Sequence, residues 1–145
     1  MNVKEALVNS TIQTFSDMAF LEVIENFENN NDSTYQNIVL IEILKPTYGS
    51  LYLLLPNELK NMITKNIYGD DFDNLKENDI DDCLLEILNV LAGNFLTSLF
   101  GNKAIYKIEL PQVLIDFKKR EDYNLVKFNA EGIKFEIFYI VENYK

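Results

Sequence analysis

The sequence predicts an α+β domain, in which a mostly antiparallel sheet of about five to six strands packs with two long helices and one short helix. Two long segments place apolar residues at helical spacing, and several short apolar segments lie between turn formers. Their order is helix, two strands, two helices and then the remaining strands. The chain has 145 residues, 48% of them hydrophobic, and shows no repeat or long linker, so we expect a single domain over residues 1–145.

The N-terminal half of the chain carries the first helix and the first hairpin. Residues 2–20 have apolar side chains at helical spacing and predict an amphipathic helix. Residues 26–34 are polar and rich in turn formers, which is typical of a loop. Residues 35–44 and 49–55 are largely apolar and predict the two strands of a hairpin. A short amphipathic helix over residues 58–67 follows.

Residues 78–100 form the helix around which the other predicted elements are arranged. Asp79 is the expected N-cap, and Gly101 is a natural residue to end the helix. One side of the helix is apolar: Ile80, Leu84, Ile87, Leu88, Leu91, Phe95 and Leu99. The opposite side is a narrow polar stripe: Asp82, Glu86, Asn89 and Gly93. A glycine inside a helix costs roughly 1 kcal/mol relative to alanine, so the missing side chain could serve the close approach of another surface.

Strands are predicted again after this helix. Residues 104–110 alternate between polar and apolar side chains until Pro111 interrupts them, and we expect residues 113–117 to continue the strand. Residues 125–129 and 133–141 predict a second hairpin. The last strand is apolar on both sides, which favours a further pairing partner for it.

Composition excludes several classes of function. A net charge of −10 disfavours binding to nucleic acid and to anionic membrane surfaces. The chain has no histidine, so a Ser-His or Cys-His nucleophile is excluded, and a zinc site would lack its commonest ligand. Cys83 is the only cysteine and cannot form an internal disulfide. With no apolar run long enough to span a membrane and no basic, apolar N-terminal leader, we expect a cytoplasmic protein that does not contact membranes.

One motif joins the central helix to the segment after it. It consists of Asp82, Glu86 and Asn89 in the spacing D-x3-E-x2-N, an Ala-Gly pair ending at Gly93, and Pro111 at the twenty-second position after the asparagine. This pattern resembles the signature of the CheC/CheX/FliY family of chemotaxis phosphatases, and EILNVLAG is closest to the core of CheX. The tetrapeptide E-x-x-N occurs four times in the chain. Only the copy at Glu86 has the preceding acid, the helix and the following Ala-Gly.

The resemblance implies a substrate and a role for each residue. The substrate would be the phosphoaspartate of a CheY-like receiver domain. Asn89 would orient the attacking water, because a carboxamide both donates and accepts hydrogen bonds, and Glu86 would pair with the receiver's lysine. Mg²⁺ would be supplied by the receiver, so no cofactor is expected on this chain. The expected partner contacts are Asp82, Leu85, Val90 and Gly93.

Two alternatives to a phosphatase remain at this point. The same surface could serve a non-catalytic module that binds a receiver or acts as flagellar switch proteins do. The second alternative is a dimerising domain of unknown ligand, in which the stripe that carries Glu86 and Asn89 would be buried. The resemblance to CheX and the two-sided last strand also predict a homodimer formed through the sheet.

Overall fold

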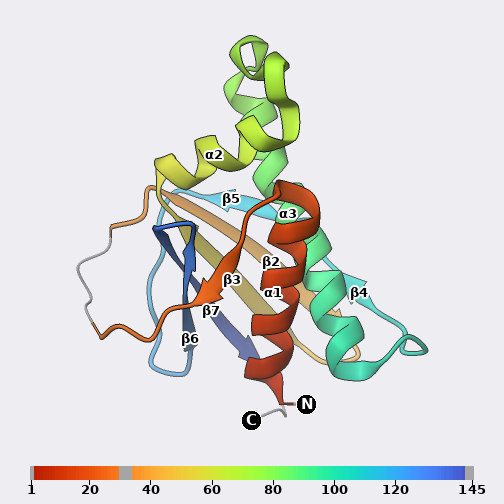
Figure 1. The fold of residues 1–145 in the computed structure, drawn as a ribbon. Coiled ribbons are helices and arrows are strands. Elements are labelled where there is room, and N and C mark those ends of the chain that lie inside the picture. The colour runs from red at the N-terminus through yellow and green to blue at the C-terminus, as the bar shows by residue number, and fades with distance from the viewer. Residues whose placement is uncertain (1, 30–33, 143–145) are drawn as a thin grey trace.

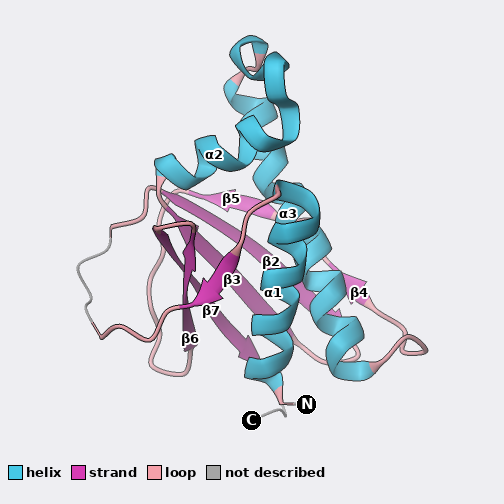
Figure 2. Cartoon of the chain, viewed as in Figure 1, coloured by secondary structure: helices cyan, strands magenta, loops and turns pink. Residues whose placement is uncertain are grey.

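The computed structural model describes residues 2–29 and 34–142, and it confirms the predicted α+β class. Figures 1 and 2 show a twisted sheet with helices against it. The helices are α1 (Val3–Ala19), α2 (Asn57–Tyr68), the 3-10 helix η1 (Gly69–Asn74) and α3 (Glu77–Phe100). The strands are β1 (Val23–Glu25), β2 (Asn37–Lys45), β3 (Gly49–Leu55), β4 (Lys107–Ile108), β5 (Gln112–Leu114), β6 (Asn124–Ala130) and β7 (Ile133–Val141).

The described strands form one sheet of seven in the order β1-β6-β7-β3-β2-β4, with β5 also paired to β2, and every pair is antiparallel. The prediction of about five to six strands missed β1, which has only three residues and therefore no alternation long enough to detect. The predicted strands over residues 104–110 and 113–117 are also shorter in the structure, as β4 and β5.

Strand β7 lies inside the sheet, which removes one argument for a homodimer. It is hydrogen-bonded to β3 on one side and to β6 on the other. Its two apolar sides are explained within the chain, since Phe135 and Ile137 face the helices and Phe138 faces the opposite layer. The expectation that β7 offers a free edge to a second copy is therefore wrong. The free edges belong to β1 at one end of the sheet and to β4 and β5 at the other.

Helices α1 and α3 cover one face of the sheet, and the main core lies beneath them (Figure 2). Three fully buried rings connect helix to sheet: Phe15 of α1 stacks on Phe135 with 4.9 Å between centroids, and Phe128 stacks on the same ring at 5.1 Å. Asn94 of α3 donates a 3.0 Å hydrogen bond to the hydroxyl of Thr14, which holds the two helices together. This packing fixes which side of α3 faces away from the sheet.

The opposite face of the sheet has a smaller core covered by the chain between β5 and β6. Ile38, Leu54 and Phe138 are buried there. Phe117, from the covering segment, packs against Phe138 with 4.8 Å between ring centroids and against Tyr52 at 5.1 Å. The chain therefore covers both sides of its own sheet.

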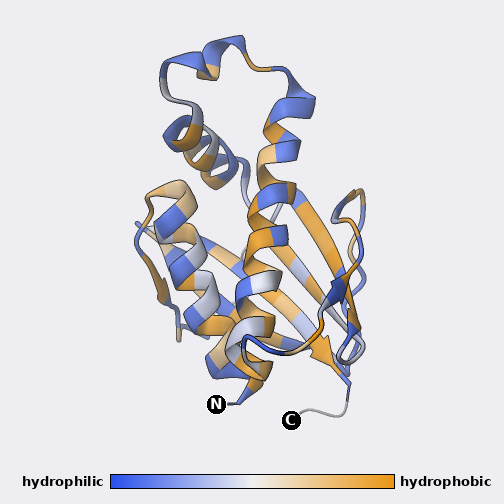
Figure 3. Cartoon of the chain, turned by 90° about the vertical axis from the view of Figure 1, so that its right-hand side faces the viewer, coloured by the Kyte–Doolittle hydropathy of each residue, from blue (hydrophilic) through white to orange (hydrophobic). Residues whose placement is uncertain are grey.

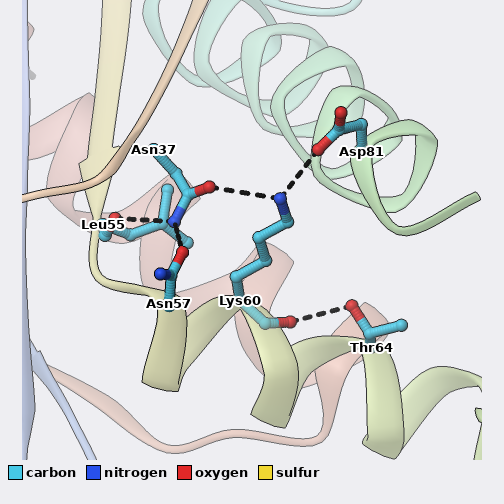
Figure 4. A network of polar contacts seen from close by, with 6 residues as sticks. All are labelled: Asn37, Leu55, Asn57, Lys60, Thr64 and Asp81. Atoms are coloured by element: carbon cyan, nitrogen blue, oxygen red, sulfur yellow. Dashed lines mark hydrogen bonds and ion pairs between the residues drawn. The ribbon is translucent and has the colours of Figure 1, made fainter. Parts of the chain in front are cut away.

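The N-terminal end of α3 is tied to α2 and to β2 through Lys60 (Figure 4). The ammonium of Lys60 donates to Asp81 at 2.8 Å and to the Oδ1 of Asn37 at 3.2 Å. The amide nitrogen of Asn37 donates in turn to the carbonyl of Leu55 at 3.2 Å. Three elements that are distant in sequence thus meet at one half-buried ammonium group.

The N-cap of α3 is not the predicted residue, although the helix begins within one residue of the prediction. The N-cap is Lys76, and Asp79 occupies the third helical position, where its carboxylate accepts a 3.0 Å hydrogen bond from the backbone N–H of Lys76. Asp79 therefore caps the helix from inside its first turn. An acid is favourable there, because it lies near the positive end of the helix dipole. The predicted end at Gly101 is confirmed, with a φ of 87° that suits glycine.

By length and composition alone, α3 could cross a membrane. Its side chains show a different use, because an apolar face along its length is buried in the core and Asp82 and Glu86 are exposed on the other. Figure 3 shows hydrophobic and hydrophilic residues alternating along this helix beside the sheet. Helix α3 is therefore the central core helix of the domain.

Candidate functional site

The polar stripe of α3 faces away from the core, as the helical spacing predicts. The residues that α3 buries lie on its other side: Cys83, Leu84, Ile87, Leu88, Leu91, Ala92, Phe95 and Leu96. Asp82 and Glu86 are exposed, while Asn89 and Gly93 are half-buried. Burial of Leu88 directly before Asn89 fixes the rotation of the helix, so the direction of the stripe follows from core packing.

Four of the six predicted site residues line one cavity. Asp82, Leu85, Glu86 and Asn89 form its α3 wall, and the volume is ≈ 390 Å³. The opposite wall is Leu110 and Pro111, from the chain between β4 and β5. Val90 and Gly93 are not among the lining residues. The structure therefore brings the candidate catalytic pair together with the proline of the motif.

The side chains of Glu86 and Asn89 are available to a ligand. Within residues 2–29 and 34–142, neither the carboxylate of Glu86 nor the carboxamide of Asn89 makes a hydrogen bond or an ion pair. Polar side chains on the outer face of a helix are satisfied by water, which the polar groups of a ligand can replace. The buried stripe expected of a dimerising domain of unknown ligand is thus not what the chain presents.

Gly93 leaves open space on the surface of α3. A Cβ added at this position would meet nothing within 4 Å. Close packing of helix on sheet, one reason for a glycine inside a helix, therefore does not apply here. Because Gly93 has no side chain, another surface can approach the helix backbone one turn beyond Asn89.

Sequence reasoning missed the second wall of the cavity. The sequence predicts Pro111 as the end of a strand and as the last residue of the motif, and it predicts Leu110 only as a strand residue. No local pattern could have assigned them, because the wall forms only when β4 and β5 pair with β2 and bring residues 110 and 111 beside α3. The one available signal was the fixed distance in sequence between the asparagine and the proline.

The groups with shifted pKa values lie away from this cavity. Cys83 is buried in the core, and this burial raises the pKa of its thiol. The thiol is therefore a poor nucleophile. Burial and the hydroxyl of Tyr123 raise the pKa of Tyr52 to about 12, on the other face of the sheet. Among the described residues, no three acidic or cysteine side chains gather in a way that could hold a metal ion. The chemistry available at the cavity is one carboxamide beside two carboxylates.

Known proteins share this fold, and a family model covers the segment that carries the motif. The chain matches the family model described as "Chemotaxis phosphatase CheX" over residues 38–125, which include the whole stripe and both residues of the second wall. Among curated proteins none matches.

Three solved structures illustrate the likeness of the fold. CheX from Vibrio vulnificus has a TM-score of 0.79 at 19% identity and covers 98% of this chain and 97% of its own. CheX from Desulfovibrio desulfuricans has a TM-score of 0.78 at 16% identity, covering 97% and 99%. CheX in the CheX–CheY–BeF3–Mg²⁺ complex of Borrelia burgdorferi has a TM-score of 0.70 at 20% identity, covering 97% of each chain. Because the family model matches more than half of the chain, this protein belongs to the CheX family of chemotaxis phosphatases.

Proposed function

We propose that this protein speeds hydrolysis of the phosphoaspartate on a CheY-like receiver domain, with Asn89 orienting the attacking water and Glu86 pairing with a lysine of the receiver. One observation carries the proposal. Two polar side chains, which make no hydrogen bond or ion pair within the described part of the chain, face one cavity from a single face of a rigid helix. The family match and the CheX–CheY complex of Borrelia burgdorferi support a receiver as the partner.

The chemistry needs little more than correct placement of a water molecule. An acyl phosphate is already activated, so the barrier falls when water is held in line with the phosphorus. The carboxamide of Asn89 can accept a hydrogen bond from that water through Oδ1 and donate one through Nδ2 to a phosphoryl oxygen. Mg²⁺ bound by the receiver would balance the phosphoryl charge. This chain then contributes orientation and not a metal ion.

Glu86 would fix the register between the two proteins. Because Glu86 and Asn89 are three positions apart on one helix, a partner held by the carboxylate of Glu86 meets the carboxamide of Asn89 at a fixed offset. A carboxylate paired with a lysine ammonium forms a charge-assisted hydrogen bond, which strengthens when the docked proteins exclude water. Asp82 would add to the negative field that attracts the lysine.

The test measures loss of phosphate from the CheY-like receivers of the source organism, phosphorylated in the presence of Mg²⁺. Asn89→Ala should lower kcat by about 100-fold, and Glu86→Ala should mainly raise KM, by about tenfold. The chain supplies a matched control in Glu58 and Asn61, which have the same spacing, are exposed on α2 and lie outside the cavity. A double change of these two to alanine should retain wild-type rates. Equal rates for wild type and Asn89→Ala would remove the assignment.

A non-catalytic receiver-binding or flagellar-switch module is the second candidate. It predicts that a receiver binds to α3 without any faster loss of phosphate.

We also expect a cytoplasmic protein and a homodimer. The dimer would have to form through a free edge such as β1, or β4 and β5, because β7 is internal. Sedimentation of a dilute sample tests the dimer directly, and a monomer alone would contradict it.

A further inference from the structure

Exposed aliphatic side chains stand on both sides of Pro111, which lines the cavity. Leu110 is 86% exposed, Val113 on β5 is 45% exposed, and Pro111 between them lines the cavity. We call these three residues the apolar ledge. Large aliphatic groups in water are unfavourable, and contiguous exposed apolar surface marks sites where another molecule docks.

The apolar ledge lies on the same side of the sheet as α3. Val113 is directly opposite Val39 in the β2–β5 ladder, and opposed residues in such a ladder project to the same face. Val39 is fully buried in the core beneath the helices. Val113 therefore projects to the helix side at the margin of the sheet, next to the cavity wall formed by Leu110.

The ledge is held in place from both ends. Before it, the backbone N–H of Glu109 donates a 2.8 Å hydrogen bond to the carbonyl of Glu42 on β2. At its other end, β5, which carries Val113, pairs with the same strand over Gln112–Leu114. A segment anchored to one strand on either side is preorganised, so a partner that docks on it loses little conformational freedom of the loop.

We infer that the apolar ledge is the second half of the docking surface for the receiver: the receiver that presents its phosphoaspartate to Asn89 buries an apolar patch on Leu110 and Val113. This inference rests on the proposed function. Leu110 and Pro111 border the same cavity as Asn89, so a partner close enough to bond the carboxamide must also cover Leu110. A second copy of this chain seated on the ledge would instead close the cavity to its substrate.

A receiver docked on the ledge would also keep bulk water out of the cavity. Asp82, Glu86 and Glu109 are exposed carboxylates around it, so the matching receiver surface should be an apolar patch flanked by basic side chains. Covering Leu110 removes bulk solvent from one side of the cavity. The pair between Glu86 and the receiver's lysine then lies in a less polar medium and is stronger.

The experiment measures binding separately from hydrolysis. The probes are the CheY-like receivers of the source organism, each activated with BeF3⁻ and Mg²⁺ and titrated into wild type, Leu110→Ala and Val113→Ala. The matched control is Ile24→Ala, because Ile24 is an aliphatic residue, 57% exposed, on the edge strand at the other end of the sheet. Thermal unfolding checks that the exposed substitutions leave the fold intact.

We expect Leu110→Ala to weaken binding by about tenfold and Val113→Ala by about threefold, with Ile24→Ala unchanged. In the phosphatase assay, we expect a higher KM for both ledge variants and a kcat that falls by at most about twofold. Wild-type affinity in both ledge variants would overturn the inference and leave the phosphatase proposal standing. Weaker binding together with equal hydrolysis by wild type and Asn89→Ala would retain the ledge and remove the phosphatase. If no receiver binds the wild type, or if the ledge variants change only the sedimentation coefficient, the ledge does not dock a receiver.

Discussion

The ion pair between Lys60 and Asp81 should contribute more to stability than an exposed pair of shorter length in the same protein. The Lys60–Asp81 separation is 2.8 Å, with side-chain exposures of 14% and 30%. Exposed ion pairs contribute roughly 0–1 kcal/mol, and breaking a fully buried pair costs roughly 3–5 kcal/mol. This pair lies between those limits. We therefore expect Lys60→Met to lower the free energy of unfolding by about 1–2 kcal/mol, part of it from the lost donor to Asn37.

A double-mutant cycle with Asp81→Asn isolates the pair itself. We expect a coupling free energy of about 1 kcal/mol from urea unfolding at low salt, falling as salt is added because Asp81 is partly exposed to solvent. Arg120 and Asp122 serve as the control. Their separation is only 2.6 Å, but the side chains are 62% and 47% exposed. Their cycle should give no coupling above experimental error.

Two results would refute this reasoning. If the losses of unfolding free energy in Lys60→Met and Asp81→Asn were additive, the pair would contribute no coupling free energy. Partial burial would then not make this pair stronger than an exposed one. If the Arg120 and Asp122 cycle gave the larger coupling, distance would decide and exposure would not. Amide hydrogen exchange in the first turns of α3 gives an independent readout, since protection there should fall in Lys60→Met while it persists at the end of the helix.

Three further outcomes follow from the structure. Gly93→Ala should raise the free energy of unfolding by about 0.5–1 kcal/mol, because a methyl group meets no neighbour there, and Gly93→Leu should fold but bind a receiver more weakly. Phe135→Ala should cost about 3–5 kcal/mol in urea unfolding, because its ring stacks on two others in the core. Burial raises the pKa of Glu136 above its usual 4.5, so its contribution to stability is complete below that pH and is lost as pH rises through the folded value. Glu136→Gln should therefore lose less stability than wild type between pH 4.5 and 7, measured by unfolding at each pH.

The elements that the sequence predicted correctly are those with long periodic patterns. The sequence predicts helix α3 over residues 78–100, and the structure has it over Glu77–Phe100. Its stripe faces outward because the buried side chains between Cys83 and Leu96, about four turns of the helix, leave one orientation. Strand β3 was predicted without error over residues 49–55. By contrast, β1 and β4 have three and two residues, so only their pairing to β6 and β2 defines them.

Half of the candidate site is therefore visible in the sequence and half is not. Asp82, Glu86 and Asn89 share a helix face through local geometry alone, which a helical wheel reproduces. Leu110 reaches the cavity only through the register of β5 against β2. Register depends on contacts between residues far apart in the chain, so no window of the sequence contains it.

Strand β2 is the common frame for both walls of the cavity. At one end, Asn37 accepts the hydrogen bond from Lys60 that is also paired to Asp81 at the start of α3. Further along, β2 pairs with β5 and holds the ledge. Misplacement of reacting groups by about 1 Å can cost roughly 100-fold in rate. Since Lys60 touches neither the cavity nor the proposed partner surface, a fall in kcat in Lys60→Met, at temperatures where the variant is fully folded, would show that the catalytic geometry depends on this frame. An unchanged kcat would show that packing of α3 on the sheet is sufficient to position Asn89.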